Sequence, residues 1–133
     1  MTPLLALALS CLGPSPDAAT LAPAIVDAVT WRASQGAAPV TDSHPLDVCL
    51  LAVYARHESG GQLHPRPWSW DARAGLSVGP WQLRPPLSDL PPRRQAIAWL
   101  RAVRLSSLGA VDSSPARAAV RLEEARQALR GAL

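Results

Sequence analysis

The spacing of apolar residues predicts a chain built mainly of helices. Apolar positions recur at helical intervals over residues 18–34, 93–108 and about 114–130, so we expect an amphipathic helix in each range. The last of these has a suitable start, with Ser114 as the cap and Pro115 just inside. No stretch alternates convincingly between apolar and polar residues as a strand would. The predicted fold class is therefore mainly α.

A fourth helix differs from the others because residues 46–55 are apolar almost all the way round. Pro45 suits the first turn of a helix, and Asp47 places a negative charge where the helix dipole favours it. A surface helix would keep one polar face, so this one is expected to be central and buried. It changes character at residues 56–59 and ends at the Gly60-Gly61 pair.

The region after this helix has no clean period. Residues 60–76 contain Gly, Pro, Asp and two tryptophans, which predicts a long irregular loop or a small β region. A loop of that length in a compact domain is usually functional. Order is expected to return at residues 77–83 as a short helix, before a proline-rich connector at residues 84–92.

The N-terminus contains a short apolar stretch that ends at Cys11. We expect residues 1–17 to be a candidate signal or lipoprotein-like segment with its linker, and residues 18–133 to form a single domain. The alternative is a frayed apolar N-terminus, because no basic residue precedes the stretch. Two cysteines do not make a disulfide framework, so Cys49 is expected to act as a small core residue.

Composition and charge narrow the partners only slightly. The 133 residues suffice for one domain, and all 13 basic residues are arginine, giving a net charge of +3. This charge mildly favours an anionic partner such as cell wall. The arginines do not form one run, so nucleic-acid binding is not expected. Arginines of the last helix are expected on a solvated face, paired with Glu123 and Glu124.

Glu58 is the candidate for chemistry. It lies at the C-terminal end of the buried helix, where both the dipole and desolvation favour the protonated carboxyl. Trp68, Trp70 and Trp81 are near enough in sequence to wall a site, although each could equally be a core residue. A neutral carboxylic acid in an apolar, aromatic pocket is the general acid of glycoside cleavage. The alternative is a solvated glutamate at a helix end. Trp31 and Trp99 lie on amphipathic helices and are expected in the core.

These residues resemble a known family. The run Glu58-Ser59-Gly60-Gly61, followed by Ser-Val-Gly-Pro-Trp-Gln-Leu at residues 77–83, looks like the catalytic core of the soluble lytic transglycosylases, which belong to the lysozyme-like superfamily. The resemblance covers roughly residues 44–114 and implies a lysozyme-like helical domain that cleaves peptidoglycan. It implies that Glu58 is the catalytic acid/base and that substrate is bound by Ser59, Ser77, Gly79, Trp81, Gln82 and Asp112. In the same way, it implies that Gly79 lets the glycan approach the backbone and that Gln82 hydrogen-bonds in the cleft.

A third family motif is only partly matched. Where the family has Ala-Tyr-Asn-Ala-Gly, residues 110–114 place Val111 and Asp112 at the Tyr and Asn positions. A second catalytic carboxylate would have to be Asp71 or Asp89, and neither has a motif around it. The resemblance therefore implies a single-acid mechanism in which the N-acetyl group of the substrate assists, giving a 1,6-anhydromuramoyl product.

Three functions stay open at this point. The first is a peptidoglycan-cleaving transglycosylase or lysozyme. The second is a degenerate lysozyme-like domain that binds glycan or serves a cell-wall or virion assembly without turnover, and the third is a plain helical interaction protein. We expect no cofactor and no metal, because the second His of a His-Glu-x-x-His motif is Gly61. The expected location is the cell envelope, after export, or a phage particle.

Overall fold

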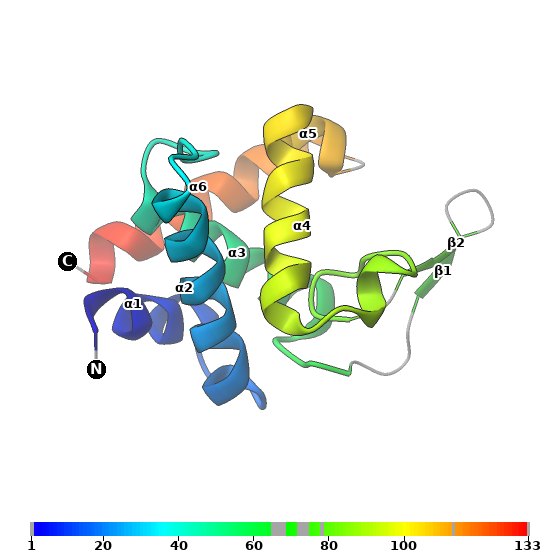
Figure 1. Ribbon diagram of the computed structural model, residues 1–133, viewed down its shortest axis with the longest axis horizontal. Coiled ribbons are helices and arrows are strands. Elements are labelled where there is room, and N and C mark those ends of the chain that lie inside the picture. Colours follow the sequence, from blue (N-terminus) through cyan, green and yellow to red (C-terminus); the bar gives the residue numbers. More distant parts are fainter. Residues whose placement is uncertain (1, 65–68, 72–74, 78, 113, 133) are drawn as a thin grey trace.

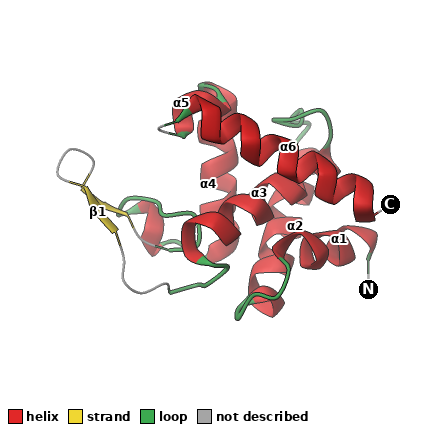
Figure 2. Ribbon diagram, turned by 180° about the vertical axis from the view of Figure 1, so that it is seen from behind, coloured by secondary structure: helices red, strands yellow, loops and turns green. Residues whose placement is uncertain are grey.

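The computed structural model describes residues 2–64, 69–71, 75–77, 79–112 and 114–132. The chain is mainly helical, as predicted (Figure 1). Its elements are α1 (Pro3–Leu12), α2 (Ala18–Ser34), α3 (His44–Ser59), β1 (Ser69–Asp71), β2 (Gly75–Ser77), the 3-10 turn η1 (Leu87–Asp89), α4 (Pro92–Leu105), α5 (Leu108–Val111) and α6 (Pro115–Ala132). Strands β1 and β2 pair antiparallel. Both views place this hairpin at one end of the molecule, away from the two chain termini (Figure 2).

Helix α3 is the central element, and the prediction of a buried helix is confirmed. Every residue from Leu46 to Ala55 is buried, and α1, α2 and α6 pack around the helix. Asp47 is the one charged residue in this stretch, and its carboxylate accepts hydrogen bonds from the backbone N–H groups of Val40 and Thr41. The helix ends at Gly60, whose left-handed backbone (φ 66°) suits glycine.

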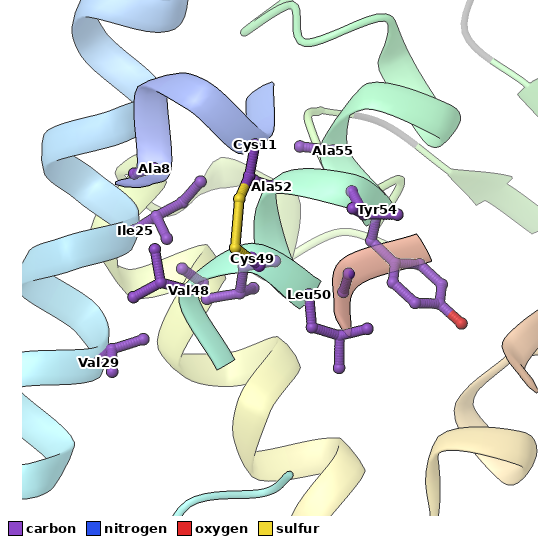
Figure 3. Packing of buried hydrophobic residues seen from close by; sticks show 14 of the residues in the cluster. Ala8, Cys11, Ile25, Val29, Val48, Cys49, Leu50, Ala52, Tyr54 and Ala55 are labelled. Carbon is purple, nitrogen blue, oxygen red and sulfur yellow. A yellow bond between two sulfur atoms is a disulfide. The ribbon is translucent and has the colours of Figure 1, made fainter. Parts of the chain in front are cut away.

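Helix α1 is part of the core, and the two cysteines are bonded to each other. Leu7, Ala8 and Leu12 are buried, and Cys11 of α1 forms a disulfide with Cys49 of α3 (Figure 3). Cys49 is a core residue as expected, but its disulfide with Cys11 was not predicted. Cysteine count and spacing do not reveal such a bond, because the pairing depends on how α1 crosses α3. In the structure the first 17 residues therefore contribute to the same core as the rest of the chain.

The other helices follow the apolar pattern, with two differences. The range 18–34 is found as predicted, but the helix expected over 93–108 stops at Leu105 and α5 begins separately at Leu108. The short helix expected over 77–83 is wrong: residues 75–77 form β2 and residues 79–82 form a turn. The alternative of a small β region after the central helix is what the structure contains. No helix within the described ranges has the length and apolarity needed to cross a bilayer.

Candidate functional site

Glu58 is held by an arginine rather than by an aromatic pocket. The residue lies in the last turn of α3, and its side chain is 31% exposed. Nη1 of Arg121, on α6, donates to its carboxylate at 2.5 Å, and the Arg121 side chain is only 11% exposed. The aromatic pocket expected around Glu58 from the sequence is therefore not what the structure places at this carboxylate. Its partner is a guanidinium from a residue 63 positions further along the chain.

Arg121 is the centre of a larger cluster. It lies 3.7 Å from the carboxylate of Asp112 and stacks over the ring of Tyr54, 4.8 Å from the ring centre. The Tyr54 hydroxyl donates to Asp112 at 2.9 Å, and Arg117 binds the same carboxylate at 2.5 Å. We call Tyr54, Glu58, Asp112, Arg117 and Arg121 the Arg121 cluster. It contains two carboxylates and two guanidinium groups, so its charges balance.

The buried members of the cluster have shifted proton affinities. Burial, followed by the hydrogen bond to Asp112, raises the pKa of Tyr54, so its hydroxyl stays a donor. Burial alone would raise the pKa of Asp112, but hydrogen bonds from Arg117, from the Ser114 backbone and from Tyr54 lower it overall. The hydrogen bond to Asp112 is in turn the main reason why the pKa of Arg117 is raised. Asp112 is thus an ionised, buried carboxylate that joins α3 to the start of α6.

The second motif is anchored to α3 through Trp81. Its indole is buried, and Nε1–H donates to the backbone oxygen of Leu51 at 3.0 Å. The expectation that Trp81 forms a cleft wall needs correction, because its indole is enclosed in the core. Gln82 follows in a left-handed conformation (φ 52°), and its Nε2 donates to the Gly79 oxygen at 2.9 Å. Leu51 and Glu58 are seven residues apart, so they share one face of α3.

Gly79 is required by a neighbouring side chain. Its φ is 86°, and a Cβ at this position would lie 2.9 Å from Oε1 of Gln95 on α4. The resemblance implied that this glycine makes room for glycan. In the structure the buried Gln95 lies beside Gly79, and both residues line a pocket of about 600 Å³. Nε2 of Gln95 donates to the backbone oxygens of Ser88 and Leu90, which fixes the segment before α4.

The serines of the predicted site have different positions. Ser59 is buried, its Oγ donates to the Ala55 oxygen at 2.7 Å, and it accepts from the Gln62 N–H at 3.3 Å. The Ser59 hydroxyl therefore stabilises the end of α3 through these two bonds. Ser77 lies in β2, and its side chain is outside the described residues, as is Trp68.

Arg56 and His57 point towards α6. Both bind Glu124, with His57 Nε2 at 2.7 Å from its carboxylate. The expectation that the arginines of the last helix lie on a solvated face, paired with Glu123 and Glu124, holds for Arg126 and Arg130 with Glu123 but not for Arg121. Arg121 and Arg117 pair with α3 and with Asp112 instead, because α6 packs along α3.

Three members of the cluster, Tyr54, Arg117 and Arg121, were not predicted as site residues from the sequence. Tyr54 is the only tyrosine in the chain and precedes Glu58 by four residues, a spacing that could have signalled a shared helix face. Arg121 carries no such signal. Within the described ranges, no three His, Cys, Asp or Glu side chains gather as a metal site would require.

Comparisons with protein-family models, with curated proteins and with solved structures find no match for this chain. Function is therefore inferred from the residues and their contacts.

Proposed function

We propose that this chain is a lysozyme-like domain that cleaves the MurNAc–GlcNAc bond of peptidoglycan, with Glu58 as its single acid/base. One observation carries the proposal: three separate segments of the family resemblance meet on α3. Glu58 ends that helix, Trp81 of the second motif binds the Leu51 carbonyl, and Asp112 of the third motif binds Tyr54 one turn before Glu58. Trp81 and Asp112 follow Glu58 by 23 and 54 residues in the sequence, yet both are hydrogen-bonded to the helix that carries Glu58.

The proposed reaction uses one carboxyl group twice. Glu58 donates its proton to the glycosidic oxygen as the bond from that oxygen to C1 breaks, and the N-acetyl oxygen of the substrate bonds to C1. The Glu58 carboxylate then takes the proton of the C6 hydroxyl as that oxygen bonds to C1, and the bond from C1 to the N-acetyl oxygen breaks, which restores the N-acetyl group. Atoms and charges balance, the product is the 1,6-anhydro sugar, and Glu58 is protonated again. Substrate-assisted glycosidases use one carboxylate in this way.

Glu58 must release Arg121 before it can act as the acid. The cluster lowers the free-energy cost of this separation, because the Arg121 guanidinium keeps the Asp112 carboxylate and the face of the Tyr54 ring as partners. A buried charge left without any partner would be far more costly. We therefore expect glycan binding to exchange the Glu58–Arg121 contact for a contact between Glu58 and the glycosidic oxygen.

The Glu58–Arg121 ion pair also favours a second candidate function. If the pair persists when glycan binds, the carboxylate stays charged and cannot donate a proton. The chain would then be a glycan-binding domain without turnover, in which Glu58 has a structural role between α3 and α6.

One experiment separates the two functions. Purified protein is incubated with peptidoglycan sacculi, bound protein is measured by sedimentation, and released muropeptides are identified by mass spectrometry. Glu58→Gln removes the acid, and Glu123→Gln is the matched control because Glu123 lies on the exposed side of α6 and pairs only with arginines of that helix. Anhydro products from the wild type and the control, but not from Glu58→Gln, support cleavage. Binding by all three without release supports the second function, and neither binding nor release overturns both.

A further inference from the structure

A groove runs along α4, and none of its lining residues belongs to the Arg121 cluster. Its volume is about 630 Å³. Figure 1 shows α4 on the near side of the molecule beside α2, and these two helices are in contact. We call this feature the α4 groove. It is lined by Trp31 of α2, by Leu87 and Leu90, and by Arg93, Arg94, Ile97, Ala98, Arg101, Ala102 and Leu105 of α4.

The apolar part of the α4 groove is unusually exposed. Trp31 is 42% exposed, Leu87 44% and Leu105 75%. Of the four large hydrophobic side chains that are exposed in the described part of the chain, these three line the groove. The expectation that Trp31 belongs to the core was wrong, whereas Trp99 is buried against Tyr54 as expected. Clustered apolar exposure of this kind marks an interaction surface.

The charged part of the groove is entirely positive. Arg93, Arg94 and Arg101 line it, and no carboxylate does. Within the described ranges, these three guanidinium groups make no hydrogen bond or ion pair. Arginines of α6 behave differently, because each lies within 4 Å of a carboxylate; they are Arg117, Arg121, Arg126 and Arg130. The groove therefore presents guanidinium groups that are available to a binding partner.

We propose that the α4 groove binds an acidic amphipathic helix of a partner protein. Arginines beside exposed apolar side chains are complementary to a helix whose apolar stripe is flanked by Asp and Glu. The concave shape favours a helix over a membrane, because a flat bilayer would reach only the rim. Helix α4 has 14 residues, so it offers about 21 Å of length, which matches four turns of a partner helix.

The spacing of the arginines refines the partner. Arg94 and Arg101 are seven residues apart on α4, which places them about 10 Å apart along one face. Ala98 lies between them on the same face, and its small side chain leaves room for an apolar side chain of the partner. We therefore expect two carboxylates two turns apart on the partner helix, with Leu or Ile between them. Nothing in this inference depends on whether Glu58 is catalytic.

The test uses a designed peptide as the probe. A helical peptide of about 18 residues carries Leu along one face and Glu on both flanks, and its matched control carries Lys at every Glu position. Binding to the full chain is measured by fluorescence anisotropy at low and at physiological salt. We expect the acidic peptide to bind, the basic peptide not to bind, and added salt to weaken the complex.

Variants of the protein locate the binding surface. The double variant Arg94→Glu/Arg101→Glu is expected to weaken binding of the acidic peptide by about tenfold or more. The control Arg130→Glu alters an arginine of α6 that is mostly exposed and should leave binding unchanged. Circular dichroism establishes that each variant is folded. If the double charge reversal perturbs the fold, Arg94→Gln/Arg101→Gln replaces it as the test variant, and its expected loss of binding is smaller because the charges are removed and not reversed. The proposal would be overturned if Arg130→Glu weakened binding as much as Arg94→Glu/Arg101→Glu does, or if the acidic peptide did not bind to the wild type. Arginine-dependent binding to phosphatidylglycerol vesicles without binding to the peptide would overturn it too.

Discussion

Removing the Cys11–Cys49 disulfide should lower the stability of the domain markedly. The bond joins residues 38 positions apart, so it excludes many conformations from the unfolded chain. For a loop of 38 residues the chain-entropy relation gives about 4 kcal/mol of stabilisation. Both cysteines are buried, so the core must also make room for two separate thiols after reduction, which adds to the entropic loss.

The expected shift in melting temperature follows from the length of the chain. A domain of 133 residues has an unfolding entropy of roughly 0.28 kcal/mol per kelvin near its midpoint. A loss of about 4 kcal/mol therefore corresponds to a decrease of roughly 14 °C. The melting temperature of the double variant Cys11→Ala/Cys49→Ala should decrease by somewhat more, because the smaller side chains also leave a small cavity.

Calorimetry with and without a phosphine reductant measures this shift. Reductant added to the double alanine variant is the control and should change nothing. Intact mass under non-reducing conditions checks the bond itself, because the disulfide form is lighter than the dithiol by two hydrogens. A lipid on Cys11 would appear in the same spectrum and would exclude the bond. If oxidised and reduced wild type melted within about 2 °C of each other, the reasoning would be refuted.

Two further substitutions test the contacts that bring the motif segments to α3. Asp112→Asn should lower the unfolding free energy by about 2–3 kcal/mol at pH 7. The pKa of Asp112 is lower in the folded than in the unfolded chain. The difference in unfolding free energy between wild type and variant should therefore persist above about pH 4 and fade as the pH drops through the folded pKa. Urea unfolding from pH 7 to pH 2 measures this difference, and a value that did not change with pH would contradict the prediction. Trp81→Phe removes the donor to Leu51 and some buried volume, so it should cost about 1–3 kcal/mol. Trp31→Phe, at an exposed position, is its matched control and should cost less than about 0.5 kcal/mol, so equal losses would argue against a structural role for Trp81.

Helices were predictable because their signals are local. The period of apolar residues gave α2 its observed range, and the lack of any polar face over 46–55 identified the central helix. Boundaries failed where a local signal was weak. Ser106 and Ser107 separate α4 from α5, and nothing in the apolar period marks that break. Likewise, the turn at residues 79–82 was mistaken for part of a helix although Gly79 and Pro80 favour a turn.

Contacts within the candidate site were less predictable, because they join distant segments. The surroundings expected for Glu58 were argued from the helix that carries it, whereas its observed partner, Arg121, lies on α6. Trp31 and Trp99 have similar helical surroundings in the sequence, yet only Trp99 meets a covering element. Periodicity identifies which face of a helix is apolar. It does not reveal whether another element covers all of that face.

Among the helices that the structure describes, arginines without a neighbouring carboxylate are concentrated on α4. Its four arginines have no acidic residue on the same helix, whereas α6 carries as many arginines beside carboxylates of α6 and its neighbours. Ion pairs cancel much of the field of α6 at a distance, so of these two helices α4 contributes the larger positive field. A substitution in α6 should therefore change how firmly α3 is held, while one in α4 should change how fast an acidic partner arrives. In the described part of the chain, α4 is thus the helix best placed to attract an anionic partner.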